Sequence, residues 1–258
     1  FGLRGYKEIE YLNLYLNNNT SIESFFIEEN DNFFFMPYVK KKISISGFEI
    51  YYDIESAYGY SGPITNCYEE KFLEKVINIF NDYCFKQNII ACLIRFDPFT
   101  NLHSKLNNGK INLSYEGDIV YKTLNNDKSI IEDYKQSVKN KISKAEKEGI
   151  KICISDNYEN FQGFVQLYTK FMKEKKANQD YIYKKDYFEK VFSKLNRKFD
   201  FFKIYIDNSN NILGGALVLK SAKTASIHLS VTSNVLKKNG ASVLLRHEIT
   251  KFYKNHNF

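Results

Sequence analysis

The chain has 258 residues, of which 43% are hydrophobic and 26% are charged. That composition excludes a disordered chain and leaves room for one large domain or two of ordinary size. No apolar stretch approaches the length of a membrane span, and the first residues do not form a signal peptide. We therefore expect a soluble cytoplasmic protein without stable membrane insertion.

Basic residues outnumber acidic residues by 37 to 30, which gives a formal net charge of +7. Such an excess is typical of proteins that bind nucleic acid, an anionic surface or a phosphate-bearing small molecule. It also accompanies the drift toward Lys, Asn, Ile, Tyr and Phe that an AT-rich genome produces, and the chain has 20 Tyr, 22 Phe and no Trp. We interpret most of the charge as background.

The cysteines and histidines are too dispersed to indicate a metal site. None of them forms the close pairs that tetrahedral zinc sites use. We therefore expect reduced thiols and no metal ion. The eight residues are Cys67, Cys84, Cys92, Cys153, His103, His228, His247 and His256.

The first half of the chain reads as strands around one amphipathic helix. Apolar residues at helical spacing predict a helix over residues 69–87, and the apolar run that follows predicts a strand over 89–96. Turn-forming residues near Asn125 place a domain boundary there. The other predicted strands cover residues 33–39, 42–46, 48–54 and 119–124.

The second half begins with a helix over residues 129–148, which Gly149 ends. A mixture of helices and a strand meander indicates the α+β class. After the first helix we expect a strand over 150–154, helices over 159–176 and 186–196, strands over 201–206, 212–220 and 225–232, and a final helix over 241–253.

A strand, a small-residue turn and a helix start follow one another between residues 225 and 248. In the strand, polar residues alternate with apolar ones, so we expect His228 on a polar face among hydroxyls and away from the core. The free N–H groups and the dipole at a helix start favour an anion, and nearby lysines add positive charge. The alternative is an ordinary capped helix. The turn consists of Lys237, Lys238, Asn239, Gly240, Ala241 and Ser242.

Several motifs resemble known acyltransferases. Lys237-x-x-Gly240-x-Ser242 resembles the turn that holds the coenzyme A pyrophosphate in the GNAT superfamily of N-acetyltransferases. Residues 53–63 contain Tyr-Gly-Tyr-Ser-Gly-Pro, which is similar to a signature of FemABX-like peptidoglycan-bridge transferases. Residues 95–98 (Arg-Phe-Asp-Pro) and the basic helix at 139–149 follow in the order of that family. The resemblance spans roughly residues 50–258.

The resemblance implies two tandem GNAT-like domains, each a mainly antiparallel sheet with flanking helices. Residues 1–125 would form the acceptor side, and residues 126–258 would carry the pyrophosphate turn. It implies acetyl-CoA as the acyl donor and, as acceptor, an amine of a cell-wall precursor, an amino sugar or a peptide. Family members continue into a further strand after the final helix, so we expect the chain to be incomplete there.

Candidate roles follow for the remaining site residues. His228 is either a general base, because its ordinary pKa lies near 6.5, or a hydrogen-bonded structural histidine. Asp53 and Glu55 are candidates to bind or deprotonate the acceptor amine, with solvated carboxylates as the alternative. Arg95 either pairs with a carboxylate or binds a ligand anion. The other candidates bind the substrate: Tyr58 and Tyr60 as a groove wall for a sugar or peptide, and Lys141 and Lys144 as ligands of a nucleotide-sugar diphosphate, with a solvated helix face as the alternative for the lysines.

Two other functions stay open. One is an aminoacyl-tRNA-dependent transferase, which the lack of a long coiled-coil insertion disfavours. The other is a non-catalytic binding module, which the imperfect turn motif allows.

Overall fold

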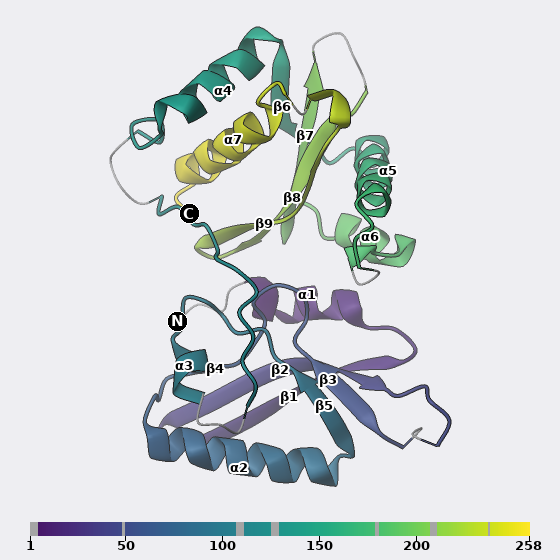
Figure 1. The fold of residues 1–258 in the computed structure, drawn as a ribbon, viewed down its shortest axis with the longest axis vertical. Helices are drawn as coiled ribbons and strands as arrows, with labels where there is room; N and C mark the ends of the chain where they lie inside the picture. Colours follow the sequence, from purple (N-terminus) through teal and green to yellow (C-terminus); the bar gives the residue numbers. More distant parts are fainter. Residues whose placement is uncertain are drawn as a thin grey trace. The chain divides into compact units, whose positions relative to one another are not determined.

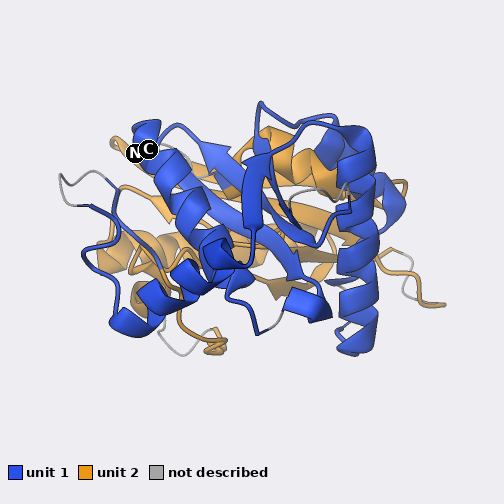
Figure 2. Ribbon diagram, turned by 90° about the horizontal axis from the view of Figure 1, so that it is seen from above, with its two compact units in different colours: residues 1–5, 121–258 blue, residues 6–120 orange. Residues whose placement is uncertain are grey.

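The computed structural model describes residues 5–47, 50–106, 111–124, 129–178, 181–206, 211–236 and 238–258. The chain divides into two compact units, one formed by Tyr6–Val120 and the other chiefly by Tyr121–Phe258 (Figure 2). Each unit contains one sheet dominated by antiparallel pairs, with helices beside it. The predicted α+β class is therefore confirmed.

The N-terminal unit is built on a sheet with the strand order β1-β2-β3-β5, and β4 pairs with β2 (Figure 1). Its pairs are antiparallel except for β3 and β5, which run parallel. Helix α2 (Glu70–Lys86) precedes β5 and buries its apolar stripe, including Phe72 and Val76, in the core beside the sheet. The strands are β1 (Thr20–Glu29), β2 (Asn32–Lys42), β3 (Tyr52–Glu55), β4 (Ile64–Thr65) and β5 (Ile89–Leu93); α3 is Leu102–Leu106.

Strand β1 was not predicted, although its hairpin with β2 has a clear sequence signal. Asn30 and Asp31 both have positive φ angles, 50° and 65°, and Glu29 pairs with Asn32 across them. A two-residue turn of this kind matches the twist of the flanking strands, and Asn and Asp are the side chains that tolerate it. The run Asn30-Asp31 between two β-prone segments is therefore the signal that predicts this hairpin.

Two predicted strands in this region are wrong. Of the predicted strand over 42–46, Lys42 is the last residue of β2, and residues 43–46 form the connection after it. Residues 119–124 form no strand, because no neighbouring strand covers them within the described chain; the side chain of Val120 is 99% exposed. The predicted strand over 48–54 begins only at Tyr52, and residues 48 and 49 lie outside the described residues.

The C-terminal unit has the all-antiparallel strand order β6-β7-β8-β9. Helices α4 and α7 cover one face of this sheet, and α5 and α6 cover the other (Figure 1). The elements are α4 (Gln136–Lys147), β6 (Ile150–Ile154), α5 (Tyr158–Glu174), α6 (Lys185–Phe192), β7 (Phe199–Ile206), β8 (Gly214–Ser221), β9 (Thr224–Thr232), η4 (Asn234–Leu236) and α7 (Ala241–Asn255). Each was predicted except η4, although α4 begins seven residues later than expected.

The two faces of this sheet have different cores because successive residues of a strand point to opposite sides. Phe202 and Ile204 of β7 pack with aliphatic side chains of α4 and α7. Phe201 points the other way and meets Phe161 and Phe164 of α5, with ring centroids 5.7 and 5.2 Å apart. The α5/α6 side is therefore an aromatic core.

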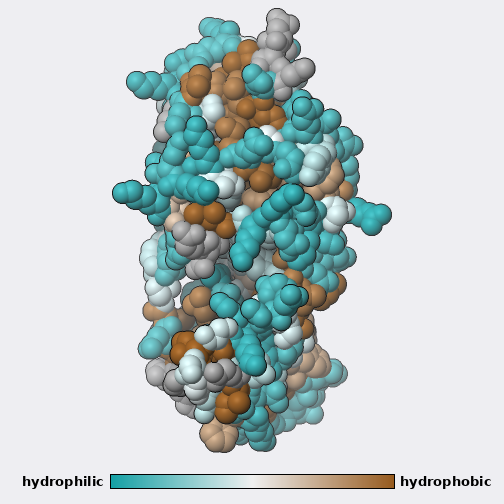
Figure 3. All heavy atoms as spheres, turned by 90° about the vertical axis from the view of Figure 1, so that its right-hand side faces the viewer, coloured by the Kyte–Doolittle hydropathy of each residue, from teal (hydrophilic) through white to brown (hydrophobic). Residues whose placement is uncertain are grey.

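The face drawn in Figure 3 shows hydrophobic side chains in separate groups between hydrophilic ones. Within the described residues, no helix has the length and apolar character needed to span a bilayer.

Candidate functional site

The turn at residues 238–240 leads into α7 and lies directly against α4. Gly240 has a left-handed backbone, with φ 76° and ψ 5°, and a Cβ there would collide with the carbonyl oxygen of Lys141 in α4. The ammonium of Lys144 donates a hydrogen bond of 3.0 Å to the carbonyl of Lys238, 94 positions along the chain. The structure thus brings Lys141 and Lys144 together with the turn. We call Lys141, Lys144 and residues 238–242 the basic corner.

The start of α7 is suited to an anion. Gly240 caps the helix without a side-chain hydrogen bond, and the described first turn holds no acidic residue. The carbonyl of Gly240 accepts from the N–H groups of Val243 and Leu244 at 2.9 and 3.0 Å, so a regular helical turn begins here. The positive end of the helix dipole therefore lies beside the lysines of α4.

The other predicted members of the corner have separate roles. Asn239 donates its N–H to the carbonyl of Leu236, Ala241 is fully buried, and the carbonyl of Ser242 accepts from Arg246. Lys237 lies outside the described residues. Gly240 is required by its left-handed backbone and by the approach of α4, so its presence alone does not indicate a ligand.

His228 is the extra residue of a β-bulge in β9. Leu229 pairs with Leu217 and Ile227 pairs with Val218, so the register shifts by one residue at His228. The shift interrupts the alternation read from the sequence: His228 becomes buried, and the Ile227 side chain is 39% exposed. The prediction that His228 lies on a polar face, away from the core, is therefore wrong.

The ring of His228 lies in the aromatic core beside α6. Its centroid is 5.9–6.4 Å from those of Tyr183, Tyr187 and Phe199, and its Nε2 is 2.6 Å from the hydroxyl of Tyr187. Burial lowers the pKa of His228 to about 3, so the imidazole is neutral at pH 7. A group with so low a pKa accepts protons weakly at neutral pH, which favours the structural role over that of a general base.

The burial of His228 predicts a pH-dependent stability. Because the folded pKa lies below the ordinary 6.5, the stabilisation is fully present above pH 6.5 and is lost as the pH falls toward 3. We expect the urea midpoint of the C-terminal unit to drop between pH 6.5 and 5, a window above most carboxylate titrations. His228→Leu should make this slope shallower by up to one proton, about 1.4 kcal/mol per pH unit.

His247, a second buried histidine of the C-terminal unit, serves as the control. Burial also lowers its pKa, and the carboxylate of Glu248 opposes that shift. His247→Leu should therefore flatten the slope less than His228→Leu. If wild type and His228→Leu showed the same dependence of unfolding free energy on pH, the assignment of this pH dependence to His228 would be contradicted.

Two of the predicted acceptor-side residues lie at strand ends: Glu55 is the last residue of β3, and Arg95 follows β5. The Glu55 carboxylate and the Arg95 guanidinium form an ion pair of 3.4 Å, and Arg95 also donates to the carbonyl of Ser56 at 2.7 Å. Arg95 therefore pairs with a carboxylate, one of the two alternatives given above. Both side chains are partly exposed, so the pair itself contributes little stability. Asp53 is half-buried within β3.

Residues 57–63, which we call the tyrosine turn, follow β3. Gly59 has φ 89°, and a Cβ at Gly62 would collide with the carbonyl of Arg95, so both glycines are needed for the path of the chain. The amide of Gly62 donates to that same carbonyl at 3.0 Å. The side chains of Tyr58 and Tyr60 remain half-exposed. The turn therefore presents two aromatic side chains from a tightly held backbone.

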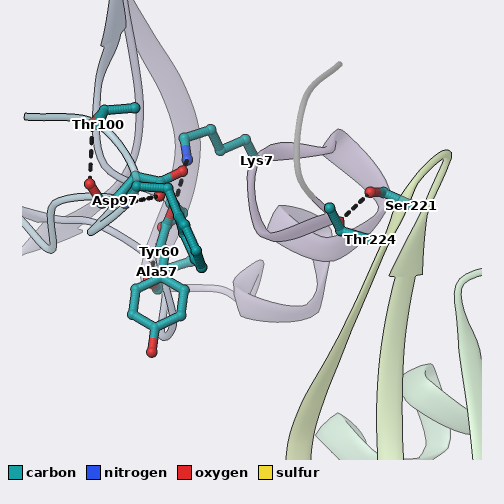
Figure 4. A network of polar contacts seen from close by, with 9 residues as sticks. Lys7, Ala57, Tyr60, Asp97, Thr100, Ser221 and Thr224 are labelled. Carbon is teal, nitrogen blue, oxygen red and sulfur yellow. Dashed lines mark hydrogen bonds and ion pairs between the residues drawn. The ribbon is translucent and has the colours of Figure 1, made fainter. Parts of the chain in front are cut away.

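Lys7, which contacts both the tyrosine turn and the loop after β5, was not predicted as a site residue. The ammonium of Lys7 is buried and lies 2.8 Å from Asp97 Oδ2 and 2.6 Å from the carbonyl oxygen of Tyr60 (Figure 4). Asp97 belongs to the Arg-Phe-Asp-Pro motif, which gives that motif a structural partner. A lysine in the short helical segment at the chain start has no pattern that would have revealed it.

No protein-family model matches the chain, and no curated protein matches its sequence significantly. Among solved structures, FemX matches over 99% of this chain and 81% of its own, with a TM-score of 0.65 at 12% identity. A second match is the C-terminal domain (DUF2156) of an Agrobacterium fabrum protein that is named as a lysylphosphatidylglycerol synthetase. This match covers 92% of this chain and 68% of that domain's chain, with a TM-score of 0.55 at 14% identity. The chain therefore shares the fold of FemX, and the resemblance to FemABX-like proteins is confirmed at the level of the fold.

Proposed function

We propose that the protein is an N-acyltransferase that moves an acyl group from acyl-CoA to an amine of a cell-wall precursor, amino sugar or peptide. The observation that carries the proposal is the basic corner. Two lysines of α4 lie against a glycine turn that opens a 15-residue helix, within a fold shared with FemX. Lysine ammonium groups and helix N–H groups together suit the diphosphate of coenzyme A.

In this proposal the C-terminal unit holds the donor. The Lys144 ammonium donates to the carbonyl of Lys238, and it forms a long ion pair of 3.8 Å with the partly exposed carboxylate of Glu148. In this proposal a phosphate takes the remaining donors of Lys144 in place of that weak surface pair, together with the exposed side chains of Lys141 and Lys238. Coenzyme A is a cosubstrate here, and the chemistry it supplies is an activated thioester with a good leaving group.

The N-terminal unit holds the amine. The nitrogen must lose a proton before it attacks the thioester carbonyl, and the thiolate then leaves as the amide forms. Asp53 and Glu55 are the carboxylates of this unit that we propose for binding the ammonium or accepting its proton. Tyr58 and Tyr60 form the wall against which the rest of the acceptor packs.

Calorimetry with acetyl-CoA tests the donor site. We expect Lys144→Gln and Lys238→Gln each to weaken binding about tenfold, since each removes a charge-assisted contact of roughly 1–3 kcal/mol. The matched control is Lys170→Gln, the same charge change on α5 at the other face of the sheet, which should leave the affinity unchanged. Gly240→Glu is unsuitable, because the clash with Lys141 would perturb the fold itself.

Activity is best followed by loss of thioester absorbance, because the chain contains four free cysteines that would consume thiol reagents. Three amines serve as probes: UDP-N-acetylmuramyl pentapeptide, a UDP-linked amino sugar and a lysine-containing peptide. Turnover with one of them supports the proposal. Acetyl-CoA binding without turnover on any of them would point to the non-catalytic module, and no acetyl-CoA binding would overturn the donor site.

A second candidate is the transfer of an aminoacyl group from tRNA. It is favoured by the fold shared with the Agrobacterium fabrum domain, whose name refers to a lysyl-bearing product. This candidate predicts tRNA binding that weakens steeply between 50 and 200 mM salt, because each neutralised phosphate releases counterions. Weak binding with little salt dependence would exclude it.

A further inference from the structure

The backbone of the tyrosine turn is held from the side by the chain start. This N-terminal segment comprises η1 (Gly5–Lys7), α1 (Ile9–Leu12) and η2 (Asn13–Tyr15). The Lys7 ammonium donates to the carbonyl of Tyr60 at 2.6 Å, and the hydroxyl of Tyr11 donates to the carbonyl of Tyr58 at 2.8 Å. Figure 4 shows the Lys7 side chain reaching from its short helix toward Tyr60 and Asp97. Two alternate carbonyls of the turn thus receive side-chain donors from the same segment.

The ring of Tyr6 packs against Gly59, the residue between Tyr58 and Tyr60 in the chain. A Cβ at Gly59 would lie 2.5 Å from that ring, so only glycine allows this approach. The ring of Tyr6 also meets those of Tyr11 and Tyr60 edge to face, at centroid distances of 5.1 and 5.7 Å. The position of the Tyr60 ring therefore depends on the segment that carries Lys7.

Lys7 and Asp97 form an ion pair of 2.8 Å, and both side chains are less than 5% exposed. The second oxygen of Asp97 accepts from the amide of Phe99 at 3.0 Å. A buried ion pair is a poor device for stability, because apolar residues of similar volume stabilise as well or better. Its advantage is geometric: the ammonium fixes the Tyr60 carbonyl relative to the loop after β5.

The tyrosine turn lies next to the polar groups proposed to bind the acceptor. Its Gly62 amide contacts the backbone of Arg95, and Arg95 pairs with Glu55. A shift of the turn would move Tyr58 and Tyr60 relative to that pair. The side chains of Lys7 and Tyr11 are buried, so they support the turn from its inner side.

We propose that Lys7 is a positioning residue for the amine acceptor, and that it acts through the backbone of the tyrosine turn with help from Tyr11. This inference rests on the proposed function. It separates the effects on the two substrates: losing the Lys7 contact should impair use of the amine and leave acetyl-CoA binding unchanged.

The test compares wild type with the double variant Lys7→Met/Asp97→Asn. Methionine has a length similar to lysine, and asparagine keeps an oxygen that can accept from the Phe99 amide. Because both charges of the pair are removed together, neither is left buried without its counter-ion. The matched control is Lys75→Met/Glu29→Asn, which removes an ion pair of 2.6 Å in the same unit with both side chains at least 42% exposed. The amine probe is the one of the three that gives the fastest turnover.

We expect the double variant to lose roughly tenfold to a hundredfold in kcat/KM for the amine, chiefly through a higher KM, with its acetyl-CoA affinity unchanged. Hydrogen exchange of residues 57–63 should accelerate, a readout that needs no substrate. The control should match wild type in every measurement. A folded double variant with wild-type amine KM and unchanged exchange would overturn the inference.

Tyr11→Phe provides a second variant if the double substitution fails to fold. It removes only the hydroxyl that bonds Tyr58 and Tyr15, and we expect a smaller rise in amine KM with faster exchange of the same turn. Wild-type values in both would also overturn the inference. Failure of the proposed function is distinguishable, since it would appear as no turnover by the wild type with any probe.

Discussion

Asp97→Ala should lower the free energy of unfolding of the N-terminal unit by about 3–5 kcal/mol. The substitution removes the carboxylate that pairs with the buried ammonium of Lys7, and a buried charge that loses its counter-ion is strongly unfavourable. It also removes the acceptor for the Phe99 amide. Urea unfolding followed by tyrosine fluorescence, together with hydrogen exchange of residues 6–120, measures the change in this unit.

Glu29→Ala is the matched control for that experiment. Glu29 also forms an ion pair with a lysine of the N-terminal unit, at 2.6 Å from Lys75, but both side chains are exposed. Exposed pairs contribute about 0–1 kcal/mol, so the control should stay close to wild type. Equal losses in the two variants would mean that removing the counter-ion of a buried lysine costs no more free energy than removing that of an exposed lysine, and would contradict this prediction.

The second large effect is expected for Asp200→Ala in the C-terminal unit. The carboxylate of Asp200 is buried and joins three elements: it is 2.8 Å from Lys220 of β8, and it accepts from the hydroxyl of Tyr253 of α7 at 2.6 Å. Burial and the contact with Asp200 both raise the pKa of Tyr253, so its hydroxyl stays protonated and donates. Removing the carboxylate should lower the free energy of unfolding by about 3–5 kcal/mol, measured by urea unfolding at pH 7.

Tyr253→Phe separates the two contacts of Asp200. It deletes one hydrogen bond to a charged group and keeps the ion pair with Lys220, so the expected loss is smaller, about 1.5–3 kcal/mol. Asp186→Ala, which removes an exposed ion pair with Lys190, should change stability by no more than about 1 kcal/mol. A Tyr253 variant less stable than the Asp200 variant would mean that ring packing, and not the carboxylate, dominates here.

The C-terminal unit was predictable from the sequence because the apolar periodicity of each helix and strand is visible within that element alone. Helix α5 and strand β6 bury side chains at the spacing that their period requires, and each is bounded by turn residues. The N-terminal unit was harder to predict. Strand β1 interleaves Glu and Ser with Phe and Ile, so its apolar content is low even though Phe25 is buried against β2 and α2.

The candidate site could be predicted only in part. The turn before α7 and the tyrosine turn are contiguous motifs, and both are turns in the structure. The contact of α4 with the turn at Gly240, and that of Lys7 with Tyr60, join segments distant in the chain, so periodicity carries no information about them. His228 was misplaced because a bulge shifts the register by one residue, so that His228 and Leu229 are both buried while Ile227 is exposed.

The link between Lys7 and Asp97 also constrains when the N-terminal segment can dock during synthesis. The two residues are 90 positions apart, so the ribosome must add those residues after Lys7 before its counter-ion exists. At ordinary elongation rates this interval is about 5–20 s. Throughout it the segment carrying Tyr6 and Tyr11 can reach Tyr58 and Gly59 but lacks the counter-ion that its lysine needs for burial. Completion of β5 and the loop after it is thus the event that allows the nascent N-terminal unit to close.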